Sequence, residues 1–378
     1  MKVYFDNAAT TQIDPEVSDL MCELLRNQFG NPSSVHRYGR ETKALVEQAR
    51  KQIAGYLNVS PSEIYFTASG TEADNMAIRC SVRDLGVKRI ISSAIEHHAV
   101  LFTSEEGRDQ QNVQLDLVNV QENGYVDMEH LKLLLQSSDK KTLVSLMHAN
   151  NEIGNLIDLK EVGDLCAEHG VLFHTDTVQT MAHYEFDFEE LNVDFAACSA
   201  HKFHGPKGVG FLYINKDVKI NPMILGGTQE RNMRAGTENI YGICALAKAM
   251  EISHRDMKEH QDHIQGIKNY MIEKLESLFP DIEYNGDPKG NSLYTVLGVT
   301  LPSTDMDEMF IFNLDIAGVA VSGGSACSSG SNIGSHVLNA LGKDSKGPSI
   351  RFSFGRFNTI EEVDYTINVL KELYKVSV

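Results

Sequence analysis

Lys202 is the first residue of this chain whose type and surroundings could do chemistry. An apolar, strand-like run at 195–199 precedes it, and a Gly-Pro turn and a second apolar run at 209–214 follow it. Most lysines are solvated surface residues. A lysine held at the end of a strand can instead form a Schiff base with an aldehyde cofactor such as pyridoxal phosphate (PLP). The other polar segments decide between these interpretations.

Asp176 and His97 also follow strand-like runs, at 171–175 and 89–94. A carboxylate at the end of a buried strand needs a cation or several hydrogen-bond donors. A protonated pyridine ring would supply the cation, whereas a plain helix N-cap is the alternative. His97 could stack on a planar ring and move protons near pH 7, although most strand-end histidines are simply hydrogen-bonded.

Two segments that carry glycine could bind an anion. Gly70 and Thr71 lie between a strand and a helix, where free backbone N–H groups and a hydroxyl suit a phosphate. A capping box without a ligand is the alternative there. Thr237 precedes a long helical segment and could either cap that helix or contact a phosphate.

Cys327 lies in a run of glycine and serine with no apolar neighbours to bury it, so we predict an exposed, reactive thiol on a mobile loop. Arg351 lies on a strand-like segment, 349–354. Its guanidinium could bridge surface carboxylates, or it could grip a substrate carboxylate through two hydrogen bonds.

These residues need a scaffold, and the pattern predicts an α/β fold. Helical segments lie between most of seven predicted strands, and this alternation is typical of a mostly parallel sheet between helices. The predicted strands are 63–67, 89–94, 113–120, 142–147, 171–175, 195–199 and 209–214. Ligands bind beyond the carboxyl ends of such strands, and the polar segments above recur there. Asp176 and Lys202 can therefore lie at neighbouring strand ends.

A smaller α+β domain is expected after a long helical segment at 239–279. Its predicted strands are 292–300, 319–321 and 349–354, and its predicted helices are 307–314, 336–341 and 359–375. We predict a large domain at 14–255 and a small domain made of 1–13 and 256–378, which carries the Cys327 loop.

Composition excludes several classes of protein. The 378 residues carry a net charge of −18, so nucleic acid is not an expected partner. The longest apolar runs fall short of the ~20 residues that span a membrane, and the N-terminus lacks an export signal. Six scattered cysteines without a CxxC pair indicate neither a disulfide scaffold nor a zinc site, and they favour a cytoplasmic location. No metal site is predicted.

Taken together, the segments resemble cysteine desulfurases of the NifS/IscS type, which are class V aminotransferase enzymes of PLP fold type I. The resemblance spans nearly the whole chain and rests on YFDNAATT, NPSSVHRYGR, ASGTEADN, EHHAV, HANNEIG, HTDTVQ, SAHKFHGPKGVG, RAGTEN, SGGSACSSGS and SIRFSFGRF. These segments occur in the family's order and at fitting spacings.

The resemblance implies a role for each candidate residue. It implies that Lys202 carries PLP and shuttles the Cα proton, and that Cys327 attacks the sulfur of bound L-cysteine. The products would be L-alanine and a persulfide on Cys327. For the cofactor ring, the resemblance implies that Asp176 contacts the nitrogen, Gln179 contacts the hydroxyl and His97 stacks on the face. It implies that the phosphate is held by Gly70, Thr71, Ser199 and His201, and that the substrate carboxylate is held by Asn151 and Arg351. Thr237 would come from the neighbouring subunit of a homodimer.

The implied sulfur acceptor is an iron–sulfur scaffold protein or a tRNA-thiolation relay. Three positions depart from the family's commonest pattern, namely Thr177, Val178 and Ala200, and the chain ends soon after SIRFSFGRF, which puts scaffold docking in doubt. The alternatives are a selenocysteine lyase, another class V aminotransferase or lyase, and a non-catalytic binding protein that keeps the fold.

Overall fold

The computed structural model describes residues 1–323, 334–343 and 347–375, and Cys327 lies outside these ranges. Its centre is a seven-stranded sheet in the order β2-β8-β7-β6-β5-β3-β4, in which β8 alone runs antiparallel to its neighbours. The strands are β2 (Ile64–Thr67), β3 (Arg89–Ser93), β4 (Gln114–Val118), β5 (Thr142–Ser145), β6 (Leu172–Asp176), β7 (Phe195–Ser199) and β8 (Gly210–Ile214). All seven coincide with predicted strands, so the predicted α/β fold with a mostly parallel sheet is confirmed.

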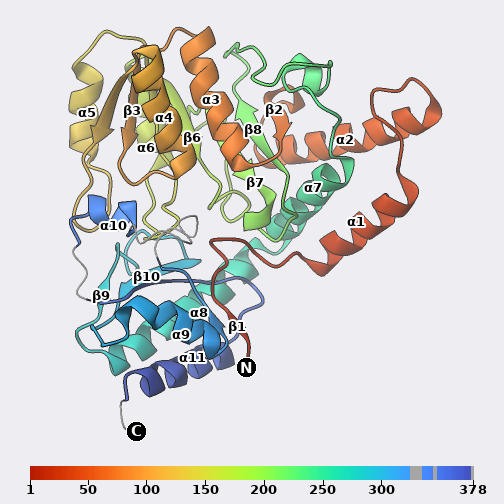
Figure 1. Cartoon of the computed structure of the whole chain (residues 1–378). Coiled ribbons are helices and arrows are strands. Elements are labelled where there is room, and N and C mark those ends of the chain that lie inside the picture. Colours follow the sequence, from red (N-terminus) through yellow and green to blue (C-terminus); the bar gives the residue numbers. More distant parts are fainter. Residues whose placement is uncertain (324–333, 344–346, 376–378) are drawn as a thin grey trace.

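Helices cover both faces of this sheet (Figure 1). Every residue of β3, β5, β7 and β8 is buried, as expected for strands that pack against helices on two sides. The helices of this half are α1 (Pro15–Asn27), α2 (Arg37–Tyr56), α3 (Gly70–Asp84), α4 (His98–Gln111), α5 (Met128–Gln136), α6 (Leu159–Glu168) and α7 (Ile240–Arg255), with 3₁₀ turns η1 (Pro61–Glu63), η2 (Ala200–Lys202) and η3 (Glu230–Asn232).

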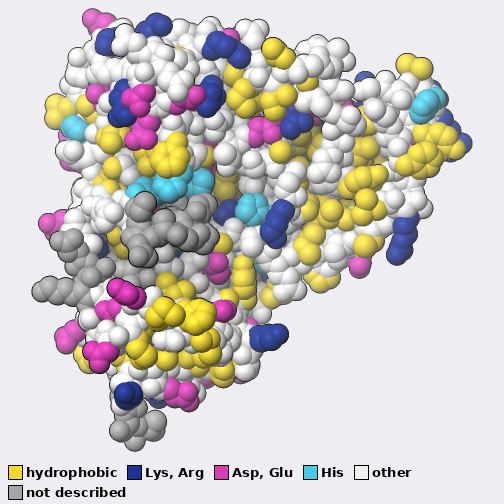
Figure 2. Space-filling model, in the orientation of Figure 1, with side chains coloured by type: hydrophobic (Ala, Val, Ile, Leu, Met, Phe, Trp, Pro, Cys, Tyr) yellow, Lys and Arg dark blue, Asp and Glu magenta, His cyan; other side chains and the backbone are white. Residues whose placement is uncertain are grey.

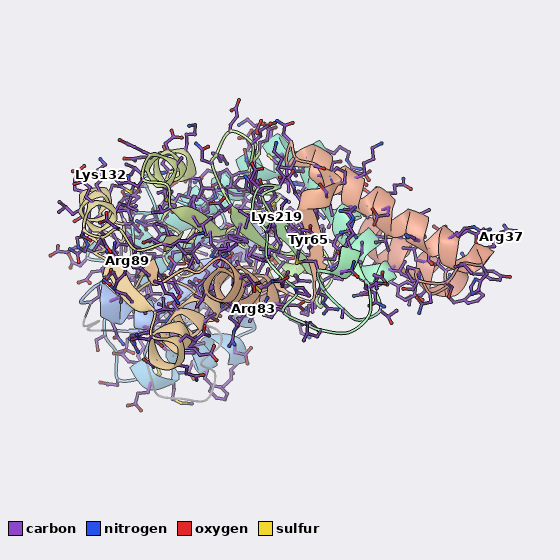
Figure 3. All side chains as sticks on the ribbon, turned by 90° about the horizontal axis from the view of Figure 1, so that it is seen from above. Arg37, Tyr65, Arg83, Arg89, Lys132 and Lys219 are labelled. Atoms are coloured by element: carbon purple, nitrogen blue, oxygen red, sulfur yellow. The ribbon has the colours of Figure 1, made fainter. Side chains whose placement is uncertain are left out.

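Helices α1 and α2 form an arm that projects from the body, with Arg37 at its tip (Figures 1 and 3). As predicted, Asp14 caps α1 by accepting a hydrogen bond from the Glu16 N–H, and Pro15 occupies the first turn. Apolar side chains line much of the arm on the face in Figure 2. In the connection between the two helices, Val35 is 88% exposed, which leaves its apolar side chain in water.

The second half contains a three-stranded antiparallel sheet in the order β12-β10-β9 and a two-stranded parallel pair of β1 and β11. Its elements are β1 (Val3–Tyr4), α8 (Met257–Leu278), β9 (Glu283–Tyr284), β10 (Val296–Thr300), η4 (Asp307–Met309), α9 (Phe310–Ile316), β11 (Val319–Ala320), α10 (His336–Ala340), β12 (Ser349–Ser353) and α11 (Ile360–Leu373). The two-residue strand β9 was not predicted, because a strand this short carries no periodic signal.

The helical segment predicted at 239–279 is two helices, because Asp256 leaves the helical conformation with φ −112° and ψ 16°. We propose that this break separates the two domains predicted at 14–255 and at 1–13 with 256–378. Two hydrophobic clusters support the proposal. One contains buried residues from Val17 to Ile252, and the other joins Val3 and Phe5 to buried residues between Ile264 and Leu370.

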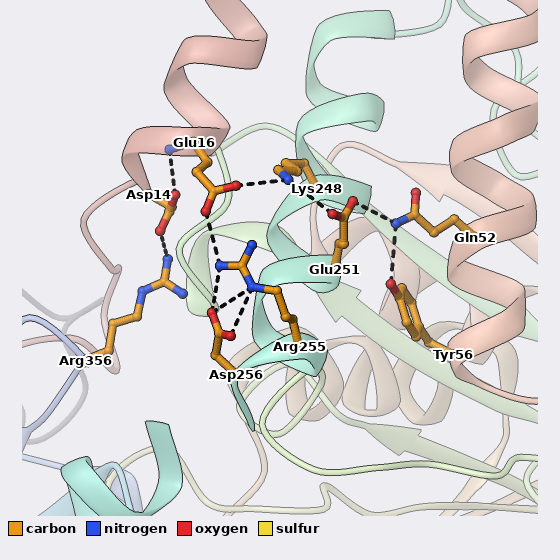
Figure 4. A network of polar contacts seen from close by, with 9 residues as sticks. All are labelled: Asp14, Glu16, Gln52, Tyr56, Lys248, Glu251, Arg255, Asp256 and Arg356. Carbon is orange, nitrogen blue, oxygen red and sulfur yellow. Dashed lines mark hydrogen bonds and ion pairs between the residues drawn. The ribbon is translucent and has the colours of Figure 1, made fainter. Parts of the chain in front are cut away.

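A network of charged and polar side chains ties α1, α2 and α7 together near this break (Figure 4). Glu16 accepts from Lys248 at 3.0 Å and from Arg255 at 3.1 Å. Arg356, which follows β12, pairs with Asp14 at the start of α1. The network therefore joins the arm to both halves of the chain. None of the helices among the described residues is long and apolar enough to cross a membrane.

Candidate active site

A cavity of about 390 Å³ lies at the carboxyl ends of the parallel strands, as predicted from the topology. Strand ends and helix starts of the large sheet form one side, and residues near β12 and α10 form the other. Its walls are Ala8, Ala9, Ser69, Gly70, Thr71, Asp74, His97, His98, Asn151, Glu152, Asp176, Val178, Gln179, Ser199, His201, Lys202, His336 and Arg351. Ten of the twelve predicted site residues are among them.

Lys202 ends the 3₁₀ turn η2, directly after β7. Its side chain is partly buried, and its Nζ donates to the backbone carbonyls of Ala8 at 2.6 Å and Ala9 at 2.9 Å. The N-terminal segment therefore holds the amine inside the cavity. The interpretation of Lys202 as a solvated surface lysine is wrong.

Asp176 ends β6, the neighbour of β7, so its carboxylate lies on the same rim as Lys202. Its Oδ1 accepts from the Val178 N–H at 2.8 Å. Burial raises the pKa of Asp176 to about 6, although the positive charge of Lys202 opposes this shift. A buried carboxylate with a raised pKa favours a cationic ligand, because the cation would offset the cost of burying its charge.

His97 caps α4, and its Nδ1 accepts from the Ala99 N–H at 3.1 Å. Burial, together with the nearby positive charge of Lys202, lowers the pKa of His97 to about 4. The imidazole is therefore neutral near pH 7, with Nε2 carrying the proton, since Nδ1 is already an acceptor. A neutral ring in the cavity wall can stack on a planar ligand.

The start of α3 supplies groups suited to an anion. Gly70 is its first residue, and the Ser69 hydroxyl accepts from the Glu72 N–H at 3.2 Å. Thr71 is exposed and lines the cavity beside it. A Cβ at Gly70 would lie 2.5 Å from Val178 Cγ2, so this position has no room for a larger residue. Helix N-terminal N–H groups beside a glycine form a ready anion site.

His201 and Ser199 lie on the same wall, in η2 and at the end of β7. His201 Nδ1 lies 3.2 Å from the Thr10 hydroxyl. Burial lowers the pKa of His201 to about 4, with further contributions from Lys202 and Lys207. Gln179 also lines the cavity, and its amide donates to the Ala8 carbonyl at 3.0 Å.

Arg351 lies on β12 with 2% of its surface exposed, so its interpretation as a bridge between surface carboxylates is wrong. Its Nη2 contacts Asp6 Oδ1 at 2.8 Å, and its Nη1 donates to the Asn151 carbonyl at 3.0 Å. Arg351 Nε is buried and has no hydrogen-bond partner among the described residues. The structure thus brings Arg351 and Asn151 together and leaves one guanidinium donor without a partner among the residues that it describes.

Among the predicted site residues that the structure describes, Thr237 does not line the cavity. Thr237 is exposed on the segment before α7, and the cap of that helix is Asn239, whose side chain accepts from the Gly242 N–H. The interpretation of Thr237 as that cap is therefore wrong. Cys327 lies outside the described residues, so its predicted place near Lys202 stays a prediction.

Four cavity residues with ionisable side chains were not predicted as site residues: Asp74, His98, Glu152 and His336. Asp74 lies one helical turn after Gly70, so helical periodicity could have indicated it. Glu152 follows Asn151 in the same segment. His98 and His336 come from different helices and lie with ring centroids 4.4 Å apart. Figure 2 shows histidine side chains grouped where the two halves of the molecule meet. No sequence signal links His336 to this site.

These residues fit an aldehyde cofactor that carries an aromatic ring and a phosphate. The wall offers an amine at Lys202, a buried carboxylate in need of a cation at Asp176, a neutral imidazole at His97 and an anion site at the start of α3. The buried Asp74 Oδ1 has no hydrogen-bond partner among the described residues, which also favours a ligand in this space.

Comparisons with known proteins agree with this geometry. The Aminotransferase class-V family pattern matches residues 3–366. The chain is 41% identical to the cysteine desulfurase IscS of Dictyoglomus turgidum over 380 residues, covering 98% of this chain and 94% of that protein. A solved structure described as a NifS-like protein matches with a TM-score of 0.91 and 36% identity, covering 100% of both chains.

A second solved structure, described as SspA in complex with cysteine, matches with a TM-score of 0.81 and 28% identity, covering 95% of this chain and 100% of the other. Fold, cavity and full-length similarity therefore agree with one another. The chain belongs to the class V aminotransferase family and, within it, to the cysteine desulfurases.

Proposed function

We propose that this protein is a PLP-dependent cysteine desulfurase, which takes sulfur from L-cysteine and releases L-alanine. The observation that carries the proposal is the convergence of Lys202, Asp176, His97 and Arg351 on one cavity. An amine, a buried carboxylate, a neutral imidazole and a guanidinium form the set of groups that a PLP enzyme acting on an amino acid needs.

PLP would be held by ten residues acting on different parts of the molecule. When bound, it supplies a positively charged ring that accepts electrons from the Cα of an amino acid. The amine of Lys202 would bind its aldehyde, and the carboxylate of Asp176 would pair with its ring nitrogen. The remaining contacts would be His97 on the ring face, Gln179 and Asn151 at the ring edge, Gly70, Thr71, Ser199 and His201 at the phosphate, and Thr237 of the neighbouring subunit.

Lys202 would also move the substrate proton. The carbonyls of Ala8 and Ala9 hold its Nζ on the cavity side, within reach of groups bound there. An amine in this position can take a proton from Cα and return one to the product carbon. Neutral His97, which lies close enough to Lys202 for their charges to interact, can assist this transfer.

Arg351 and Asn151 would bind the substrate carboxylate. The buried Arg351 Nε donor, to which no described residue is hydrogen-bonded, matches an anionic oxygen, and the pairing with Asp6 fixes the plane of the guanidinium. Because Arg351 is buried, a carboxylate bound to it is largely shielded from water. L-cysteine is the substrate we propose for this position.

Cys327 would act as the nucleophile toward the substrate sulfur. Its thiolate would form an S–S bond while the Cβ–S bond breaks, and the electron pair of the broken bond would remain on carbon. That carbon then takes up a proton and becomes the methyl group of alanine. The sulfur stays on Cys327 as a persulfide until an acceptor removes it.

We propose a homodimer, because Thr237 is exposed and does not line the cavity of its own chain. The sulfur acceptor would be a protein of iron–sulfur cluster assembly or of tRNA thiolation. A cytoplasmic location is also proposed, because four of the five described cysteines are buried, free thiols, which suits a reducing compartment.

The test uses Cys327→Ala beside the wild-type protein. Both should show the absorbance of bound PLP, but only the wild type should form alanine from L-cysteine. Mass mapping of the treated wild type should place one extra sulfur atom on the Cys327 peptide. Full turnover of L-cysteine by Cys327→Ala would instead indicate a lyase that needs no thiol. A protein that stays colourless with added PLP would indicate a non-catalytic member of the fold.

A further inference from the structure

His183 does not line the cavity, but its ring contacts both the backbone of Lys202 and the side chain of Tyr294. Its Nε2 is 3.2 Å from the backbone carbonyl oxygen of Lys202. Its Nδ1 is 2.7 Å from the hydroxyl of Tyr294. Both ring nitrogens therefore have partners, and one partner is the backbone of the proposed cofactor lysine.

The two contacts define the tautomer of His183. Burial lowers the pKa of His183 to about 4, so the ring is neutral near pH 7. A neutral imidazole has one N–H donor and one acceptor nitrogen. Because a carbonyl only accepts, Nε2 donates to Lys202, and Nδ1 must accept from the Tyr294 hydroxyl. The hydrogen bonds thus run in one direction, from Tyr294 through His183 to Lys202.

The far end of this chain belongs to the segment that leads into β10. Tyr294 is 6% exposed, and its ring meets that of His183 edge-on at 70° with centroids 5.6 Å apart. From α8, the side chain of Gln261 donates to the His183 carbonyl at 2.8 Å. Both the ring and the backbone of His183 are therefore bound to the second half of the chain.

The turn η2 that carries Lys202 is held on its other side by the N-terminal segment. The carbonyl of His201 accepts from the Thr11 N–H at 2.9 Å and from the Thr11 hydroxyl at 3.0 Å. His183 binds the next carbonyl along the chain. Since consecutive peptide groups are rigid units, fixing both carbonyls also restricts the direction in which the Lys202 side chain leaves the backbone.

We propose that Tyr294 and His183 are positioning residues that fix the backbone of Lys202, so that the place of the β10 segment sets the place of the reactive amine. The proposal deepens the proposed function and rests on it. A movement of the small-domain half would reach Lys202 through these two hydrogen bonds, without any contact with the ligand.

The first test reads the tautomer and does not depend on turnover. In purified holoenzyme labelled with ¹⁵N-histidine, the His183 signals are assigned by their loss in His183→Gln. We expect a proton on Nε2, none on Nδ1, and a changed Nδ1 shift in Tyr294→Phe. A proton on Nδ1, or an Nδ1 chemical shift that Tyr294→Phe leaves unchanged, would overturn the proposed hydrogen bonds from Tyr294 through His183 to Lys202. This holds even if the enzyme desulfurates cysteine normally.

The second test measures the effect on the amine. The absorbance band of PLP bound to Lys202 is titrated with pH in His183→Leu, His183→Gln and Tyr294→Phe, with Tyr213→Phe as the control. Tyr213 is also buried, at 1% exposure, but lies on β8. A hydrogen bond of about 1 kcal/mol corresponds to a change of roughly five- to tenfold.

We therefore expect a shifted titration midpoint and a five- to tenfold lower kcat with little change in KM for His183→Leu. In His183→Gln, whose amide can replace the Nε2 donor, the titration midpoint and kcat should both lie close to the wild-type values. Tyr294→Phe should change them less than His183→Leu does. An unshifted midpoint in His183→Leu, or an equal shift in Tyr213→Phe, would contradict the proposal.

Discussion

Two buried arginines occupy contrasting regions of this molecule. Arg50 on α2 makes two hydrogen bonds of 2.8 Å to Glu230, a third of 2.7 Å to the Ile64 carbonyl, and lies over the Phe66 ring at 4.6 Å. Arg351 in the cavity wall leaves its buried Nε without a partner among the described residues.

The same contrast extends to the neighbours of each arginine. Glu230 also accepts from the Phe66 N–H at 2.8 Å, so its carboxylate is well satisfied. Beside the cavity, Asp74 Oδ1 lies 3.4 Å from His174 Nε2 but has no hydrogen-bond partner among the described residues, and burial raises the pKa of Asp74 well above its ordinary value. Saturated charges mark a structural role, whereas unused hydrogen-bonding capacity beside a cavity marks the place of a ligand.

Removing the charge of Glu230 should have the largest effect on stability. Glu230→Gln removes the only buried carboxylate that pairs with Arg50 among the described residues, and breaking a buried ion pair typically costs about 3–5 kcal/mol. We expect this loss in the free energy of unfolding, measured by urea denaturation. Glu47→Gln is the matched control, because Glu47 also contacts Arg50, at 3.2 Å, but is 42% exposed. Equal losses of unfolding free energy in the two variants would contradict the expectation that the buried partner Glu230 matters more than the exposed partner Glu47.

Arg351→Lys should change catalysis more than stability. The substitution keeps a positive charge near Asp6 but loses the planar fork that would bind a carboxylate. We expect kcat/KM for L-cysteine to fall about 10- to 100-fold, or roughly 1.4–2.7 kcal/mol, with a small change in thermal midpoint. A large fall in the midpoint with normal kinetics would place Arg351 in the same structural class as Arg50.

The buried histidines predict a smaller, pH-dependent effect. Burial lowers the pKa of His97, His148 and His201 to about 4 in the folded chain, against about 6.5 in an unfolded one. Between these values the unfolded chain binds more protons, so the stability present above pH 6.5 is lost as the pH falls toward 4. Thermal midpoints should therefore decline steadily as the pH of the measurement is lowered from about 6.5 to about 4.

Cofactor binding should change the contribution of His201, which lines the cavity, to the acid sensitivity of stability. It should not change the contribution of His148, which does not line the cavity. A phosphate beside His201 favours the protonated ring and reduces that residue's share of the acid sensitivity. His201→Asn should therefore flatten the pH dependence more in the cofactor-free protein than in the PLP-loaded protein. His148→Asn should flatten it equally in both. An equal response of the His201 variant would argue against a phosphate at this position.

The sequence by itself determined the large sheet and the rim on which its polar residues gather. Apolar runs of strand length between helical segments leave few alternatives to a parallel sheet, and parallel strands bring Asp176 and Lys202 to one edge. Local patterns also identified the Asp14 cap, because a cap depends on residues a few positions apart.

Only the tertiary structure decided which distant groups meet. Asp6 and Arg351 are 345 positions apart, and His183 and Tyr294 are 111 apart, so no local pattern relates them. Capping of α7 was one of two interpretations of Thr237, and the structure has Asn239 as the cap, because both residues have capping side chains and the exact start of the helix depends on packing. Side-chain pairing across a fold depends on three-dimensional distance, which the order of residues alone does not state.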